Sequence, residues 1–354
     1  MTIDELLHLT IQRNASDLHL VSGVVPMIRV DGVLMPAGDY PVLAPELAEM
    51  LIFSLVTPKQ KELLLANKEI DLVYQFQQLG RFRVNAYYEK GSLAAALRLI
   101  PAKVSTIEEL RIPAIHHQFA QLNQGLILIT GPTGHGKSST LAAIINEINR
   151  TRSTHIVTIE DPIEYIHHPD KSIISQRELH QDTHSWQVAL RSVLREDPDV
   201  VLVGEMRDYE TIAAALTVAE TGHLVLATLH TNSAAQTIDR IIDVFPENQQ
   251  PQIRMQLSNA LEAVIAQRLL PAVKGGRLPA TEILLATSAV KNTIREGKTH
   301  QLDNVIQTSG ELGMMSLEAS LAYWVKMGEI DLRTARLHSL RPDELDRLVK
   351  GRMG

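Results

Sequence analysis

The chain of 354 residues contains no cysteine. This absence excludes disulfides, thiolate metal sites and cysteine nucleophiles, and it fits a reducing compartment, so we expect a cytoplasmic protein. The N-terminus carries Asp4 and Glu5 where a signal peptide would carry basic residues, and no apolar run approaches the roughly 20 residues that span a bilayer. We therefore expect contact with a membrane only through partners.

Basic charge and aromatic side chains are also scarce. The formal net charge is −7 at pH 7 and aromatic residues make up 4% of the chain, whereas nucleic-acid-binding proteins usually present a basic surface and stacking aromatics. We expect no nucleic-acid partner. A nucleic-acid translocase stays open as an alternative, because a basic channel formed only in an oligomer would escape a whole-chain count.

One glycine-rich segment matches the complete phosphate-binding pattern G-x-x-x-x-G-K-[ST], also called Walker A. It follows an apolar run at 126–130, predicted to be a buried strand, and precedes a predicted helix at 139–148. The glycines let backbone N–H groups turn towards phosphates, and the helix N-terminus favours an anion. Lys137 is expected to reach the β- and γ-phosphates of ATP, and Ser138 to bind Mg²⁺. The predicted nucleotide-binding residues are Gly131, Pro132, Thr133, Gly134, His135, Gly136, Lys137, Ser138 and Ser139.

The patterns before this loop predict a small α+β domain. A capping box at Thr2 and Glu5 starts a first helix, Asp31-Gly32 predicts a tight hairpin, and a helical stretch covers 45–67. Strand patterns follow at 72–76, 82–87 and 93–99. The polar segment between Pro101 and Pro113 is interpreted as a linker.

The patterns after the loop predict a mostly parallel sheet followed by a helical region. Apolar runs at 156–159, 200–203 and 224–228 are typical of central strands, and the chain beyond 285 is largely helical. With about two domains expected from the length, the chain is predicted to be α/β. The predicted parts are an N-terminal domain over 1–100, a linker over 101–113, an ATPase core over 114–288 and a helical C-terminal region over 289–354.

Carboxylates follow two of the predicted strands. Glu160 ends the first, at the sheet edge where nucleotides bind in such folds, and it is our candidate for the base that activates water. The alternative is that the acids here only cap a helix after Pro162, since acidic residues favour helix starts. Glu205 follows the second strand and is our candidate for binding Mg²⁺ through its water shell. Because Gly204 precedes it where a second acid is usual, the base role falls to Glu160.

Histidines flank the strand at 224–228. His230 and Thr228 are expected to reach the γ-phosphate region and to report whether it is filled, although a lone histidine such as His223 more commonly only packs. The histidine pairs at 116–117 and 167–168 lack metal-ligand spacing and are interpreted as surface or loop residues.

Together these motifs resemble the secretion ATPase superfamily of type IV pilus and type II secretion motors, most closely its pilus retraction branch. In the family's order they are ASDLHL at 15–20, RFRVN at 81–85, the phosphate loop, the acidic box TIEDPIEY at 158–165, LVGEMRD at 202–208 and the histidine box at 221–231. The four-cysteine insertion of assembly motors is missing. The segment AVKNTIRE at 289–296 resembles the branch's signature A-I-R-N-L-I-R-E but departs at Val290, Lys291 and Thr293. Those departures leave an accessory retraction paralogue or a related transport motor as alternatives.

The resemblance implies a PAS-like N-terminal domain and a RecA-like P-loop ATPase domain in a homohexamer that hydrolyses ATP with Mg²⁺ to drive pilus retraction and twitching motility. It further implies an inner-membrane platform protein as partner, allows a paralogous retraction ATPase, and places the protein at the cytoplasmic face of the inner membrane. A non-hydrolysing nucleotide-gated scaffold and a small-molecule kinase are the remaining alternatives.

The family also supplies arginines from the first domain to the nucleotide, and the matching positions are Arg81, Arg83 and Arg98. Arg81 and Arg83 alternate with Phe82 and Val84, so both guanidinium groups are expected on one strand face. That arrangement fits a charge clamp and, equally, solvated surface arginines.

Overall fold

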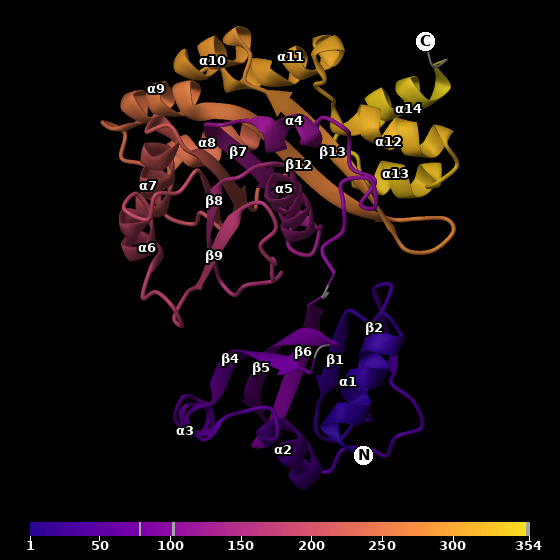
Figure 1. The fold of residues 1–354 in the computed structure, drawn as a ribbon. Coiled ribbons are helices and arrows are strands. Elements are labelled where there is room, and N and C mark those ends of the chain that lie inside the picture. The colour runs from indigo at the N-terminus through magenta and orange to yellow at the C-terminus, as the bar shows by residue number, and fades with distance from the viewer. Residues whose placement is uncertain (78, 101–102, 352–354) are drawn as a thin grey trace. The chain divides into compact units, whose positions relative to one another are not determined.

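The computed structural model describes residues 1–77, 79–100 and 103–351. The chain divides into two compact units, Met1–Lys103 and Val104–Gly354, each with its own sheet and hydrophobic core (Figure 1). The division falls inside the linker predicted over 101–113, of which residues 101 and 102 lie outside the described residues. No helix in the described ranges is both long enough and apolar enough to cross a bilayer.

The N-terminal unit is built on a six-stranded antiparallel sheet with the order β3-β2-β1-β6-β5-β4. The predicted capping box is confirmed, since the Thr2 hydroxyl accepts from the Glu5 N–H and the Glu5 carboxylate accepts from the Thr2 N–H. The predicted hairpin at Asp31-Gly32 is also confirmed, with both residues at positive φ. The elements are α1 (Ile3–Gln12), β1 (Asp17–Leu20), β2 (Met27–Val30), β3 (Val33–Pro36), α2 (Pro45–Phe53), α3 (Pro58–Asn67), β4 (Glu69–Phe76), β5 (Gly80–Glu89) and β6 (Ser92–Ile100).

The helical stretch predicted over 45–67 is two helices. Thr57 forms a second capping box with Gln60, and Pro58 occupies the first position of α3, where its missing N–H costs nothing. The chain therefore breaks and restarts between α2 and α3.

The C-terminal unit is built on a seven-stranded sheet with the order β13-β12-β7-β11-β10-β8-β9, in which every neighbouring pair except β12–β13 is parallel. This confirms the mostly parallel sheet. Apolar residues of α4 and α5 cover one face, and those of α6 to α11 cover the other. The strands are β7 (Gly125–Thr130), β8 (His155–Glu160), β9 (Ile173–Glu178), β10 (Val200–Val203), β11 (Leu224–Leu229), β12 (Leu261–Pro271) and β13 (Arg277–Leu285).

The helices of this unit follow the predicted alternation and then the predicted helical region. Helices α12 to α14 pack on one end of the β12–β13 hairpin, where Leu270, Leu278 and Ala280 join their core (Figure 1). The helices are α4 (His116–Gln121), α5 (Lys137–Thr151), α6 (Trp186–Val193), α7 (Tyr209–Glu220), α8 (Ala234–Asp243), α9 (Gln250–Ala260), α10 (Ser288–Arg295), α11 (Leu302–Thr308), α12 (Leu317–Lys326), α13 (Leu332–His338), α14 (Pro342–Lys350) and the 3₁₀ turns η1 (Thr299–Gln301) and η2 (Gly310–Leu312).

The segment just after the unit boundary is anchored. Ile107 and Ile112 are buried and pack against Ala143 of α5, and Arg111 pairs with Glu329 at 3.2 Å. The polar composition of this segment is typical of a linker without fixed contacts. The side chains of Ile107 and Ile112 nevertheless attach it to α5, the helix that follows the phosphate loop.

Candidate nucleotide-binding site

The predicted phosphate loop connects β7 to α5, in the strand-loop-helix order that the sequence indicates. All six residues of β7 are buried, and α5 begins at Lys137 with Gly136 at its N-cap. Strands β12 and β11 flank β7, followed by β10 and β8. Parallel strands end at one sheet edge, so β11, β10 and β8 deliver His230, Glu205 and Glu160 to the edge that carries the loop.

Two glycines of the loop are required by its contact with β12. A Cβ on Gly131 would lie 2.2 Å from the Gln267 carbonyl oxygen, and one on Gly136 would lie 2.8 Å from Gln267 Nε2; both residues have positive φ. The buried Gln267 side chain donates from Nε2 to the His135 carbonyl at 2.9 Å and accepts from Thr140 Oγ1 at 2.8 Å. The sequence did not predict that Gln267 supports the loop. The one indication is that a polar residue stands at this position inside an apolar run.

Lys137 lies at the centre of the site. Its Nζ donates to the carbonyls of Gly131 (2.7 Å) and Pro132 (3.0 Å) and lies 3.4 Å from His230 Nδ1. Burial lowers the pKa of Lys137, and the negative charges of Glu205 and Glu164 oppose that shift. The ammonium group is therefore partly desolvated and lies in the field of two carboxylates. Phosphate oxygens could replace the two loop carbonyls as its hydrogen-bond acceptors.

Glu205 and His230 meet across neighbouring strands. His230 Nε2 lies 3.0 Å from Glu205 Oε1, and its Nδ1 lies 3.5 Å from Thr133 Oγ1 in the loop. Arg207 holds the same carboxylate, with Nε 2.8 Å from Oε1 and Nη2 2.8 Å from Oε2. Burial alone would raise the pKa of Glu205, but the hydrogen bond from Arg207 and the nearby His230 outweigh it and hold the pKa below its usual range.

This carboxylate and the Ser138 hydroxyl are hard oxygen donors of the kind that Mg²⁺ prefers, and Mg²⁺ usually completes its shell with water and phosphate oxygens. No group of three or more histidine, cysteine, aspartate or glutamate side chains in the described part of the chain could hold a metal ion by itself. The carboxylate of Glu205 and the hydroxyl of Ser138 are of a kind that fits a magnesium ion completing its shell with water and phosphate oxygens.

Glu160 lies at the carboxyl end of β8. Its Oε1 accepts from Thr158 Oγ1 at 2.7 Å and from Gln176 Nε2 at 3.3 Å, while its Oε2 accepts from the Glu164 N–H at 3.4 Å. Burial raises the pKa of Glu160 to about 7 despite these hydrogen bonds. A carboxyl group that titrates near neutral pH suits proton transfer. The alternative that the acids cap a helix after Pro162 is wrong, because the chain from 161 to 172 contains no helix.

Gln176, which the sequence did not indicate, and Tyr165, the last residue of the acidic box, connect that box to the phosphate loop. Gln176 on β9 donates to Glu160 and, at 2.8 Å, to the Tyr165 carbonyl. The Tyr165 hydroxyl lies 2.8 Å from Ser139 Oγ, at the start of α5. Glu164, which precedes Tyr165, is the member of the box whose charge acts on Lys137.

Several predicted contacts differ in the structure. Thr228, which was expected to reach the γ-phosphate region, instead donates its hydroxyl to the Gly204 carbonyl and ties β11 to β10. His223 contacts the Val218 carbonyl and Thr221, in keeping with the packing role expected for it. The interpretation of His116 as a surface or loop residue is wrong, because it lies buried in α4. His167 lies in a loop, as interpreted, but its side chain is buried, and burial lowers the pKa of both histidines to about 4.

The three predicted arginines lie in the N-terminal unit, where Arg83 on β5 stands directly opposite Arg98 on β6. Arg98 Nε lies 2.9 Å from Asp17 Oδ1, and Arg83 Nε lies 3.9 Å from Asp71 Oδ1. The predicted alternation holds, since Phe82 and Val84 are buried while Arg83 is exposed. Nε and Nη1 of Arg81 are buried without a hydrogen-bond partner in the described ranges. Like charges placed opposite each other destabilise a sheet, and here Asp17 and Asp71 offset the charges of Arg98 and Arg83.

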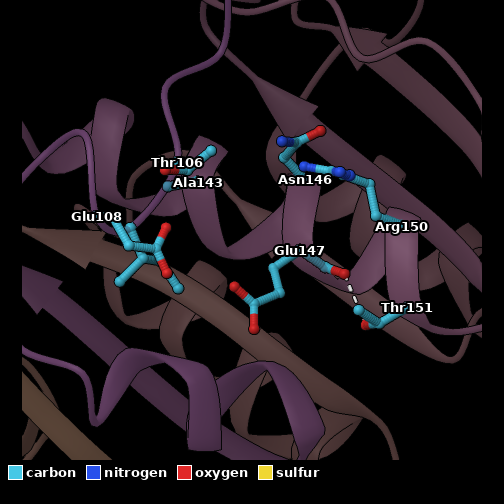
Figure 2. Close-up of a pocket in the computed structure, with 8 residues that line it drawn as sticks. Thr106, Glu108, Ala143, Asn146, Glu147, Arg150 and Thr151 are labelled. Carbon is cyan, nitrogen blue, oxygen red and sulfur yellow. Dashed lines mark hydrogen bonds between the residues drawn. The ribbon is translucent and has the colours of Figure 1, made fainter.

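A cavity of about 280 Å³ lies away from the phosphate loop, between the segment at 106–108 and the C-terminal half of α5. Figure 2 shows Glu108 and Glu147 on either side of it. His117 bridges these two carboxylates, with Nε2 3.0 Å from Glu108 Oε1 and Nδ1 2.7 Å from Glu147 Oε1. The cavity thus belongs to the anchoring of the boundary segment and contains none of the predicted nucleotide-binding residues.

With this geometry in place, the chain can be set beside known proteins. Residues 2–275 match the family model of type II/IV secretion system proteins. The chain is 46% identical over 343 residues to the type IV pilus retraction ATPase PilT of Pseudomonas aeruginosa, covering 97% of this chain and 99% of that protein. It is 39% identical over 351 residues to the type IV pilus ATPase PilU of the same organism, covering 99% and 92%.

A solved structure of the pilus retraction motor PilT with bound ADP matches with a TM-score of 0.89 at 46% identity, covering 98% of this chain and 99% of that one. This likeness extends over both units and confirms the α/β, RecA-like ATPase fold that the sequence predicts.

Proposed function

Because the chain belongs to the type II/IV secretion system protein family, we propose that it is an ATP-hydrolysing motor, assembled as a homohexamer, that drives type IV pilus retraction and thereby twitching motility. The observation that carries the proposal is the convergence of Lys137, His230 and Glu205 at the sheet edge that holds the phosphate loop. Two pilus ATPases of Pseudomonas aeruginosa, PilT and PilU, match nearly the whole chain.

In the proposed mechanism the loop N–H groups and Lys137 bind the β- and γ-phosphates of ATP. Ser138 and Glu205 would hold Mg²⁺, the latter through water, and the ion when bound neutralises phosphate charge. His230, between Lys137 and Glu205, senses whether the γ-phosphate region is filled. Glu160 takes a proton from the attacking water, whose oxygen bonds to the γ-phosphorus as the bond from that phosphorus to the β–γ bridging oxygen breaks, which leaves ADP and inorganic phosphate. Departure of the phosphate removes the γ-phosphate contacts and releases the loop and its neighbours.

The arginines of the N-terminal unit complete the proposal. Arg81, Arg83 and Arg98 are proposed to clamp the nucleotide phosphates, because one sheet face gathers these cations and leaves part of the Arg81 guanidinium without a partner in the described ranges. Closure of the units around ATP and their reopening after hydrolysis would supply the mechanical stroke.

The proposed partners are further copies of this chain, an inner-membrane pilus platform protein and, in some hosts, a paralogous retraction ATPase. The proposed location is the cytoplasmic face of the inner membrane. The departures of the segment at 289–296 keep an accessory retraction ATPase or a related transport motor as the second candidate.

Phosphate release from purified, assembled protein tests the enzymatic part of the proposal. We expect Mg²⁺-dependent ATP hydrolysis that single-stranded DNA does not stimulate, because the chain is acidic and poor in aromatic residues. Absent phosphate release would contradict the motor and favour a nucleotide-gated scaffold. Stimulation by single-stranded DNA would instead favour a translocase.

A further inference from the structure

The phosphate loop is attached to its neighbouring strand β12 through one residue, His135. Its carbonyl accepts from Gln267 Nε2 at 2.9 Å, and its ring Nδ1 lies 3.0 Å from the backbone nitrogen of Leu269. Gln267 and Leu269 are two positions apart on β12, so both face the same side of the sheet. Phosphate binding, which uses loop N–H groups, does not account for this ring contact.

The ring contact fixes the protonation state of His135. A backbone N–H can only donate, so Nδ1 must accept and the ring proton of the neutral tautomer resides on Nε2. Protonation of Nδ1 would set an N–H against the Leu269 N–H and break the contact. The hydrogen bond from Leu269 therefore exists only while the imidazole is neutral, whereas the bond from Gln267 to the His135 carbonyl does not depend on the ring.

The surroundings of His135 favour that neutral form. The charged and titratable groups that act on it within the described residues are Lys137 on α5, Arg268 on β12, Arg277 on β13 and His338 on α13. Every one of them is cationic when charged. Burial first, and then these neighbours, lower the pKa of His135 below its usual value.

Strand β12, which forms hydrogen bonds with His135, is in turn bonded to the C-terminal helix α13. Arg268, between Gln267 and Leu269, donates from Nη1 to the His338 carbonyl at 2.6 Å. Arg277 on the paired strand β13 reaches the Gly134 carbonyl at 3.5 Å. The β12–β13 hairpin therefore contacts the loop at Gly134 through Arg277 and at His135 through Gln267 and Leu269.

We propose that His135 is a positioning residue whose neutral ring fastens the phosphate loop to β12 and thereby sets nucleotide affinity. When the ring is protonated, the loop adopts its binding conformation for a smaller fraction of the time, and apparent affinity falls by that fraction. Affinity for nucleotide phosphate should therefore decrease as pH falls through the pKa of His135. The inference rests on the proposed nucleotide binding at this loop.

The test uses fluorescent N-methylanthraniloyl-ADP with Mg²⁺ and the full-length protein between pH 5.5 and 8.5. His135→Asn places Oδ1 where Nδ1 lies and cannot titrate, whereas His135→Ala removes the acceptor. We expect His135→Ala to bind about tenfold more weakly at pH 8, because a single hydrogen bond to a partly buried group is lost, and His135→Asn to recover most of that loss. The wild type should weaken relative to His135→Asn on acidification. The titration of the nucleotide itself cancels in that comparison.

His300→Ala, at an exposed histidine of η1, controls for histidine removal and should leave both affinity and pH profile unchanged. Equal affinity of His135→Ala and wild type, or parallel pH profiles of wild type and His135→Asn, would overturn the inference while leaving the proposed function intact. A wild type that binds no nucleotide at any pH would overturn both.

Discussion

Glu160→Gln is expected to reduce ATP turnover by roughly 10² to 10⁴, about 3 to 5 kcal/mol of activation free energy, while nucleotide affinity stays intact. The amide matches the carboxyl group in size and can still accept from Thr158, but it cannot take a proton from water. Single-turnover phosphate release and nucleotide titration on the same preparation separate the two effects.

The pH profile gives a second readout of the same residue. Because burial raises the pKa of Glu160 to about 7, the carboxylate needed for proton abstraction forms only as pH rises through that value. Turnover of the wild type should therefore rise between about pH 6 and 8. Glu164→Gln is the matched variant, since Glu164 lies in the same box and acts on Lys137. Normal turnover in Glu160→Gln together with a loss in Glu164→Gln would transfer the base role to Glu164.

Lys137→Ala is expected to weaken ATP binding about 100-fold, near 3 kcal/mol, because a largely desolvated ammonium group is lost from the phosphate site. The variant also leaves the Gly131 and Pro132 carbonyls without their donor. Equilibrium titration with ATP and Mg²⁺ measures the effect. Lys298→Ala, at an exposed lysine of the same unit, is the control and should bind as the wild type does. An affinity of Lys137→Ala equal to that of the control would contradict the assignment of the loop.

The sequence predicted most accurately where the signal is local. The loop between β7 and α5 needs particular residues at adjacent positions, and so do the capping box at Thr2 and the hairpin at Asp31-Gly32. Alternation along β5 likewise predicted which side chains leave the core. In each case the interaction that determines the local structure involves residues only a few positions apart, so it can be predicted without knowledge of the fold.

The prediction fell short where the cause is a contact between distant segments. Strand β12 follows α9 directly, Leu261 after Ala260, with no turn residues to mark the change, so the strand that carries Gln267 was missed. The pairing of Arg83 with Arg98 depends on strand register. The different environments of Glu160 and Glu164 depend on Gln176 from β9, an edge strand too polar to be recognised.

The most direct test of the central claim, retraction powered by ATP hydrolysis, is a count of surface pili in the native host. It compares a deletion strain with strains that express, at equal level, the wild-type gene or the Glu160→Gln form. The account predicts excess pili and lost twitching in the deletion strain, corrected by the wild-type gene and not by Glu160→Gln. Bare cells in the deletion strain would contradict retraction and indicate an assembly motor, and unchanged pili would assign the protein to another transport system.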